Sequence, residues 1–360
     1  MHKPASPTDR PTRNRAPDQL NAARWSSRMT RLGAGALALS TLALAGLALR
    51  EWRTARLAER RHPPLGRFLE IDGVRVHYAE WGEGPPVVLL HGNGTMVDDW
   101  AISGLATAAS QRFRVIAIDR PGYGYTSRPR DRLWTAEAQA DLIGRALARL
   151  GIEKPVVVGH SWGAIVSLAL ALDHPGSVRG LVLLGGCYFP TRRADVWAFS
   201  PPAIPVIGDM MRYTVSPSIM RRLAPKIIRA SFAPRLVPER FTRYFPLDLA
   251  LRPWQLLGSA ADSALMVPTV AELSRRYAEL RLPLHILSGD EDRVVTPARQ
   301  SIRLHEAVPH SALQLLPGIG HMLHYFAHKE ILYAVEAAMQ RPGEPTRMGV
   351  PNRHEAAVGS

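Results

Sequence analysis

Hydrophobic positions along the chain divide it into an N-terminal segment, a main domain and a polar tail. An uncharged apolar run extends from Leu32 to Leu49. From residue 62 to residue 340, short apolar runs alternate with longer amphipathic stretches, except over residues 188–280. Residues 1–28 and 341–360 are polar and lack apolar periodicity. We expect both of these end segments to be disordered.

The main domain shows an alternation of predicted strands and helices. Its first residues, FLEIDGVRVHYAEWG, predict a β-hairpin that turns at Asp72 and Gly73. Amphipathic stretches at 135–150 and 162–174 predict helices. Further short strands are predicted at 86–90, 115–119, 156–159, 182–184, 284–288 and 313–316. This alternation predicts an α/β fold with a mostly parallel central sheet flanked by helices.

Residues 188–280 interrupt the alternation. They are rich in proline, arginine and aromatic residues, and helical patterns cover 218–230 and 271–280. We interpret this segment as a helical cap inserted between two strands. The core then consists of residues 62–187 and 281–340. A cap of this size needs an apolar underside, which predicts an enclosed apolar pocket for a small-molecule substrate.

The N-terminal apolar run has the length of a membrane span. Its eighteen residues extend about 27 Å as a helix, close to one hydrocarbon core. We predict that residues 30–50 form a single-pass membrane anchor. The alternative is a signal segment cleaved near the triplet Ala43-Leu44-Ala45, or one translated from Met29, which would leave a secreted or periplasmic protein. Arginines flank both ends, so the positive-inside rule does not orient the segment.

The charge of the chain changes this picture little. The formal net charge is +14, and residues 1–61 carry twelve basic against four acidic residues. Only four of the 45 basic residues are lysines, and no known nucleic-acid-binding module is recognisable. We therefore predict no nucleic-acid partner. A single cysteine, Cys187, excludes a disulfide within the chain. The oligomeric state is not predicted by these patterns.

The strongest candidate for chemistry is the motif Gly159-His160-Ser161-Trp162-Gly163. It follows a predicted strand and opens a predicted helix. A serine on such a sharp turn projects its hydroxyl at the carboxyl edge of the sheet, and glycines two residues away on both sides give room for close packing. The helix N-terminus behind the serine favours developing negative charge. This context predicts that Ser161 is a nucleophile.

A second loop, His91-Gly92-Asn93-Gly94, follows the predicted strand at 86–90. Its glycines allow backbone N–H groups to turn toward the serine. We predict that the amides of Asn93 and Trp162 form an oxyanion hole. His91 is expected to hold the shape of the loop.

A serine nucleophile requires a base, and the base requires an orienting acid. Two late strands end in loops that supply these groups. Asp290 and Asp292 follow the strand at 284–288, and His321 follows the strand at 313–316. Both loops lie at the same sheet edge as Ser161, and the chain order is serine, acid, histidine.

The segments HGNG, DRPGYG, GHSWG, GDEDRVVTP and GIGH occur in the order and spacing of α/β-hydrolases, and from residue 68 to residue 340 the chain resembles that family. The resemblance implies a nucleophile at Ser161, an acid at Asp292 and a base at His321. Among capped members the chain is similar to epoxide hydrolases and haloalkane dehalogenases. Those enzymes use an aspartate nucleophile, so Ser161 argues against their chemistry here.

The expected activity is that of a carboxylesterase-like serine hydrolase acting through an acyl-enzyme, on small or medium apolar esters. Carbon–carbon bond hydrolysis or cofactor-free perhydrolysis on the same three residues is the alternative. An inactive, membrane-tethered binding protein is a further alternative of another class. No metal and no organic cofactor is expected.

Overall fold

The computed structural model describes residues 16–191 and 194–340. The expectations for residues 1–15 and 341–360 lie outside these residues. Eight strands among the described residues form one sheet in the order β1-β2-β4-β3-β5-β6-β7-β8. Their bounds are β1 Arg67–Ile71, β2 Val74–Trp81, β3 Pro86–Leu90, β4 Arg114–Ile118, β5 Val156–His160, β6 Gly180–Leu184, β7 Leu284–Gly289 and β8 Ala312–Leu316.

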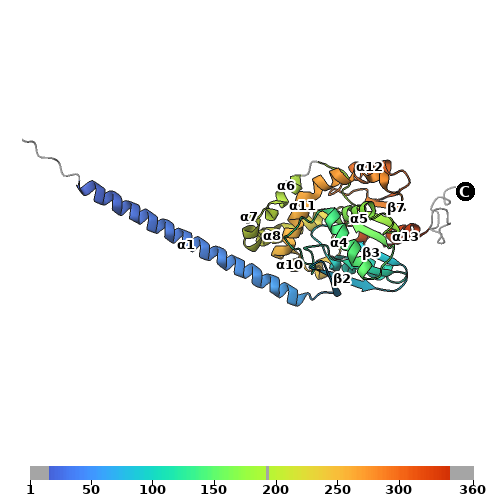
Figure 1. The fold of residues 1–360 in the computed structure, drawn as a ribbon, viewed down its shortest axis with the longest axis horizontal. Helices are drawn as coiled ribbons and strands as arrows, with labels where there is room; N and C mark the ends of the chain where they lie inside the picture. The colour runs from blue at the N-terminus through green and yellow to red at the C-terminus, as the bar shows by residue number, and fades with distance from the viewer. Residues whose placement is uncertain (1–15, 192–193, 341–360) are drawn as a thin grey trace, which may run out of the picture. The chain divides into compact units, whose positions relative to one another are not determined.

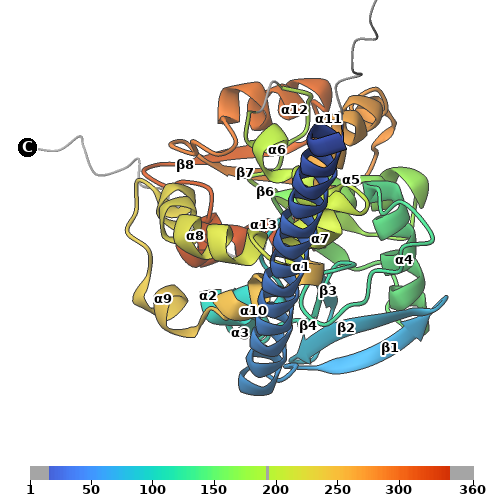
Figure 2. The same ribbon diagram turned by 90° about the vertical axis from the view of Figure 1, so that its left-hand side faces the viewer.

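The sheet is antiparallel only at one edge. The hairpin β1–β2 and the pairing of β2 with β4 are antiparallel, and the remaining neighbours are parallel. Figure 1 shows β2 at the lower side of the main domain, and Figure 2 shows β1 and β2 at one edge of the sheet and β8 toward the other. The expected α/β fold is thereby confirmed, as is the turn at Asp72 and Gly73.

Helices cover both faces of the sheet because side chains of the buried strands alternate between two apolar cores. In β3, Val88 and Leu90 belong to one core, and Val87 and Leu89 belong to the other. The first core is covered by α4 (Ala136–Arg149) and α5 (Trp162–Asp173), with α12 (Ser301–Ala307) beside them. The second is covered by α2 (Val97–Ser103), α3 (Leu105–Ala109) and α13 (His328–Met339).

Between β6 and β7 the chain forms a set of helices. These are α6 (Ala194–Phe199), η1 (Pro201–Ala203), α7 (Ile207–Tyr213), α8 (Ser216–Phe232), α9 (Glu239–Tyr244), α10 (Leu247–Ala250), α11 (Pro253–Leu273) and η2 (Tyr277–Glu279). Figure 1 shows α6, α7, α8 and α10 together at one side of the main domain. The short 3-10 helices η3 (Pro297–Arg299) and η4 (Leu323–Tyr325) follow β7 and β8.

One helix of this segment differs from the expected pattern. A helix was expected over residues 271–280, but α11 runs from Pro253 to Leu273, and only a 3-10 turn follows. Pro253 stands in the first turn, where the missing N–H group of proline costs no intrahelical hydrogen bond, and Pro268 lies inside the helix. Because of these two prolines, the hydrophobic periodicity of the sequence did not predict this 21-residue helix.

Helix α1 is longer than expected at both ends. It extends from Ala16 to Arg61, so residues 16–28, expected to be disordered, are helical instead. Pro17 and Asp18 are favourable at a helix start, and alanine, glutamine and leucine follow them. Residues 34–61 form the one helix in the described part of the chain that is long and apolar enough to cross a membrane, judged by length and composition alone. A signal sequence meets the same criterion.

The chain divides into two compact units at Arg50, so residues 51–61 belong to the main domain. Ala58 packs in a small apolar cluster with Met96, Leu249 and Ala250. Glu59 pairs with the buried guanidinium of Arg252 at 2.9 Å. The main domain therefore begins about eleven residues before the expected boundary at residue 62.

Candidate active site

Ser161 lies on a strained turn between β5 and α5. Its backbone angles are φ 52° and ψ −114°, in a region that residues with a Cβ rarely adopt. Such a conformation costs about 1–3 kcal/mol and is found mostly at functional sites. The amide of Ser161 donates to the carbonyl of Leu184 at the end of β6. The turn is thus held against the neighbouring strand.

The two glycines of the motif are required by close packing. A Cβ on Gly163 would lie 2.1 Å from the carbonyl oxygen of Leu90, and one on Gly159 would lie 2.6 Å from the carbonyl oxygen of Gly163. Both contacts involve backbone atoms that cannot move aside cheaply. The glycines therefore let α5 start directly beside β3, as the sequence pattern requires.

The backbone amides of Asn93 and Trp162 are available for a ligand. Among the described residues, neither amide donates a hydrogen bond to a carbonyl or a side chain. The Cβ of Ser161 lies 3.2 Å from the position that a Cβ on Gly92 would occupy, so the loop after β3 approaches the serine closely. Trp162 opens α5, where the partial positive charge of the helix is concentrated.

Asp292 and His321 are in direct contact. The Nδ1 atom of His321 lies 2.8 Å from Oδ2 of Asp292, and both side chains are buried. The other carboxylate oxygen of Asp292 accepts hydrogen bonds from the amides of Val294 and Val295, both at 2.8 Å. These bonds fix the carboxylate and leave Oδ2 to orient the imidazole.

The residues at the end of β6 lie close both to the Asp292–His321 pair and to the turn that holds Ser161. A Cβ on Gly185 would lie 3.4 Å from Oδ2 of Asp292 and 3.4 Å from Nδ1 of His321. Gly185 follows Leu184, whose carbonyl accepts from the Ser161 amide. The structure thus brings the three sequence-predicted residues to one region of the sheet edge.

The competing acid Asp290 is placed differently. Its Oδ1 accepts a hydrogen bond from the amide of Gly318 at 2.8 Å, and the residue is exposed. It ties together the loops after β7 and β8. Likewise His91 accepts from the Arg120 amide at 3.0 Å, and burial lowers its pKa to about 4. A neutral, fully bonded His91 holds the loop after β3, in line with its expected role.

A cavity of about 280 Å³ lies above these loops. Its polar lining residues include Asn93, His160 and His321. The rest of the wall is mostly apolar and comes from the segment between β6 and β7: Val196, Phe199, Met220, Ala224, Ile227, Ile228, Phe232, Phe241, Phe245, Leu247, Ala250, Leu251, Leu256 and Met266. The expectation of an apolar underside to the cap agrees with this lining.

Sequence reasoning missed the network that holds Asn93. Its amide nitrogen donates to the carbonyl of Ser259 and lies 3.1 Å from the Ser263 hydroxyl. Its Oδ1 accepts from the hydroxyls of Ser259 at 2.6 Å and Tyr123 at 2.9 Å. Ser259 and Ser263 belong to α11, so this helix holds the loop after β3 in place.

A buried histidine cluster behind the serine was also missed. The rings of His160 and His321 are 4.9 Å apart, and His160 lies 4.6 Å from His324. The Nε2 atom of His160 lies 3.0 Å from the carbonyl oxygen of His321. Burial lowers the pKa of His160 well below its usual value, so this ring is neutral and Nε2–H donates. The residue before Ser161 thereby supports the backbone at His321.

No group of three or more metal-ligating side chains is gathered anywhere in residues 16–191 and 194–340.

Comparison with known proteins gives consistent relatives. A family model described as the alpha/beta hydrolase fold matches residues 85–327. The chain is 30% identical to 2-hydroxy-6-oxo-2,4-heptadienoate hydrolase of Pseudomonas putida, over 71% of this chain and 90% of that protein. It is 26% identical to haloalkane dehalogenase 2 of Mycobacterium bovis, over 76% and 94%. An esterase structure from Exiguobacterium antarcticum aligns with a TM-score of 0.62 at 20% identity, over 76% and 99%.

Proposed function

Since the chain belongs to the alpha/beta hydrolase fold family and is an enzyme of that family, we propose that it is a serine hydrolase with Ser161 as nucleophile, His321 as base and Asp292 as orienting acid. The observation that carries the proposal is the strained turn at Ser161 together with the 2.8 Å contact between Asp292 and His321. A simpler turn could join β5 to α5 at lower energetic cost, and a surface ion pair could join the two loops at lower cost.

The proposed mechanism is acyl transfer. His321 takes the proton from the Ser161 hydroxyl as the oxygen attacks the substrate carbonyl. The amides of Asn93 and Trp162 donate to the oxyanion that develops. The protonated histidine then gives its proton to the leaving alcohol, and the acyl-enzyme forms. Water attacks the acyl-enzyme with His321 again as base, which releases the acid and restores Ser161.

The cavity favours small or medium apolar acyl groups. Its volume of about 280 Å³ lies near the lower end of ligand pockets, and its wall is mostly hydrophobic. Peptides and polysaccharides would leave their polar groups unpaired against this wall. Carboxylic esters with short or medium acyl chains match both the volume and the lining.

A second candidate is carbon–carbon bond hydrolysis. It is favoured by the 30% identity to the Pseudomonas putida enzyme named for a 2-hydroxy-6-oxo-dienoate. Such a substrate carries a carboxylate and an enol, whereas the described cavity wall bears few charged groups. We therefore rank ester hydrolysis first.

A substrate panel separates the two candidates. We expect p-nitrophenyl esters from acetate to octanoate to be cleaved faster than a 2-hydroxy-6-oxo-2,4-dienoate, with kcat/KM falling for palmitate because the cavity is small. Release of p-nitrophenol and loss of dienoate absorbance are the measurements. Faster cleavage of the dienoate would reverse the ranking, and cleavage of a peptide but of no ester would overturn both candidates.

We also propose that the apolar segment at residues 30–50 anchors the enzyme in a membrane. Its support is the length and composition of the helix, and cleavage as a signal segment is the alternative. Full-length protein should stay in the membrane fraction through high-salt and carbonate washes. A chain that begins at Glu51 should be soluble, because it keeps Ala58 and Glu59 in their contacts. Release of the full-length chain by salt alone would indicate surface attachment instead.

A further inference from the structure

A second concave site, of about 450 Å³, is lined by six arginines. It shares no lining residue with the cavity at Asn93, His160 and His321. The arginines come from separate segments of the main domain: Arg56 near the end of α1, Arg75 in β2, Arg128 and Arg130 after β4, Arg212 in α7 and Arg252 before α11. We call it the arginine site. Six guanidinium groups around one hollow repel each other unless anions lie among them.

Two carboxylates hold four of these arginines. Glu59 pairs with Arg56 at 3.0 Å and with Arg252 at 2.9 Å. Asp209 pairs in the same way with the arginines at 130 and 212. Each carboxylate thus has one negative charge against two positive guanidinium groups, so these four arginines keep a surplus of positive charge.

The other two arginines are compensated less. Arg128 lies 3.4 Å from Asp262, which already pairs with the buried Arg120 at 2.5 Å. The guanidinium carbon of Arg75 lies 3.6 Å from the ring centre of Phe68, and no carboxylate of the described residues pairs with it. Because Asp262 is shared with Arg120, which lies outside the six, only Glu59 and Asp209 count in full against the six arginines, and a surplus of about four positive charges remains.

The site also holds an unused donor. Arg212 is 2% exposed, and its Nε has no hydrogen-bond partner among the described residues. Burial lowers the pKa of this guanidinium, so a further anion nearby would stabilise its charged form. Buried donors in proteins are nearly always paired. The first turn of α11, with Pro253 and Trp254 at the wall, adds the positive end of a 21-residue helix.

We propose that the arginine site binds a phosphate group, carried by the headgroup of an anionic lipid or by a soluble phosphate ester. Guanidinium groups match the geometry of phosphate oxygens and bind them through paired N–H donors. A phosphate monoester, with up to about two negative charges, compensates more of the surplus than a singly charged carboxylate. The proposal does not depend on the identity of the substrate cleaved at Ser161.

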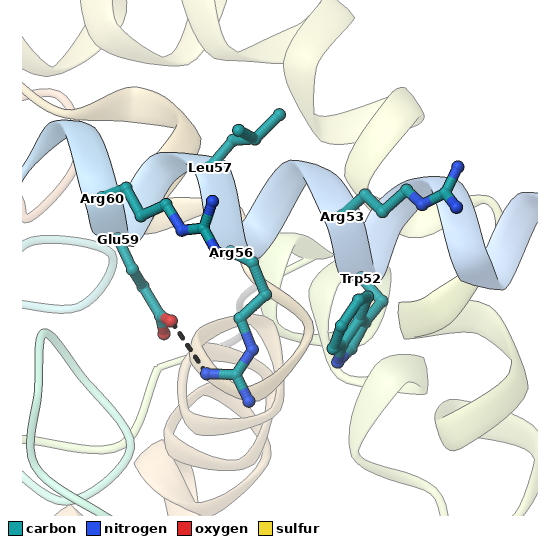
Figure 3. A pocket seen from close by; sticks show the side chains of 6 residues that line it. All are labelled: Trp52, Arg53, Arg56, Leu57, Glu59 and Arg60. Carbon is teal, nitrogen blue, oxygen red and sulfur yellow. Dashed lines mark hydrogen bonds and ion pairs between the residues drawn. The ribbon is translucent and has the colours of Figure 1, made fainter.

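The neighbourhood of the site supports a lipid source. Arg56 and Glu59 also line an adjoining pocket together with Trp52, Arg53, Leu57 and Arg60. In Figure 3, Trp52, Arg56 and Glu59 extend from the same side of the helix. Tryptophan with several arginines just beyond an apolar segment is typical of the membrane interface. Arg56 follows Leu49 by seven residues, which span at most about 25 Å of chain.

The test measures binding to the full-length Ser161→Ala protein in neutral detergent micelles by calorimetry, because the dihexanoyl probes carry short carboxylic esters that the proposed hydrolase could cleave. The probes are dihexanoyl phosphatidate, glycerol 3-phosphate and, as the zwitterionic comparison, dihexanoyl phosphatidylcholine. We expect a phosphate monoester to bind and the phosphatidylcholine to bind at least tenfold more weakly. Tight binding of phosphatidate alone identifies a lipid headgroup, and equal binding of glycerol 3-phosphate identifies a soluble ester. Binding of neither monoester overturns the proposal.

The variants are chosen from exposed residues. Arg75→Gln and Arg56→Gln should each weaken phosphate binding at least tenfold. Arg222→Gln is the matched control, because Arg222 is an exposed arginine on α8 outside the site. Unchanged Tm, and unchanged ester hydrolysis where Ser161 is kept, show that the variants are folded. Equal phosphate affinity in Arg75→Gln, Arg56→Gln and Arg222→Gln would overturn the proposal while leaving the proposed hydrolase unaffected.

Discussion

Replacing Ser161 with alanine should lower kcat for p-nitrophenyl butyrate by roughly three to six orders of magnitude. The alanine has no oxygen to form the acyl-enzyme, so only the oxyanion amides and the binding pocket remain to assist attack by water. KM should change little, because the hydroxyl contributes mainly to the transition state. The measurement is the steady-state rate of p-nitrophenol release by the purified variant.

The matched control is Ser231→Ala. Ser231 lines the cavity that His321 also lines, and its hydroxyl donates to the Ile227 carbonyl at 3.0 Å within α8. Its loss should change kcat by no more than a few-fold. Similar losses in both variants would mean that Ser161 matters only for the shape of the cavity.

Replacing Asp292 with asparagine should lower kcat by about four orders of magnitude. The carboxylate that faces Nδ1 of His321 at 2.8 Å would be replaced by an amide, which no longer fixes the imidazole tautomer or stabilises its charged form. The amides of Val294 and Val295 would still hold the side chain in place, so the Tm should fall only slightly. Steady-state rates and thermal unfolding are the measurements.

Asp290→Asn is the comparison for this prediction. Asp290 is exposed and contacts the Gly318 amide, not the histidine. Its substitution should reduce kcat by less than tenfold. A larger loss at Asp290 than at Asp292 would contradict the assignment of the acid.

The sheet could be predicted from the sequence because its strands are short apolar runs that end in loops. Two strands differ from their expected ranges by a single residue at the end: β5 at Val156–His160 and β7 at Leu284–Gly289. The prolines in α11 and the polar start of α1 hid two helical stretches, because both depart from the amphipathic pattern. Pro268 inside α11 argues against a helix by propensity alone, although the helix continues through it.

The candidate site could be located because each of its chemical groups directly follows a strand. Strand ends that meet at one edge of the sheet pointed to Ser161, to His321 and to Asp290 or Asp292. The choice of Asp292 came from the resemblance to α/β-hydrolases. The supporting contacts of the site could not be predicted. The partners of Asn93 in α11 lie 166 and 170 residues further along the chain. Such contacts depend on how the cap docks, and no local pattern encodes that.

The arginines of α8 lie outside the arginine site. Arg222 and Arg229 are exposed on α8, and Arg221 is half-buried beside Asp248. Arg192 and Arg193 lie outside the described residues. The strongest concentration of arginines is instead the site shared by α1, β2 and the cap. It could not be foreseen, because its members are spread over almost two hundred residues.

The central claim, an acyl-enzyme at Ser161, is tested most directly by mapping the covalent intermediate. The enzyme is mixed with excess p-nitrophenyl butyrate, quenched in acid within milliseconds, digested and analysed by mass spectrometry. We predict a butyryl group on the peptide that contains Ser161, and its absence from the Ser161→Ala variant. A butyryl group on another residue would contradict the account. Rapid ester hydrolysis with no acylated peptide, in the wild-type enzyme and in the His321→Ala variant alike, would contradict it too.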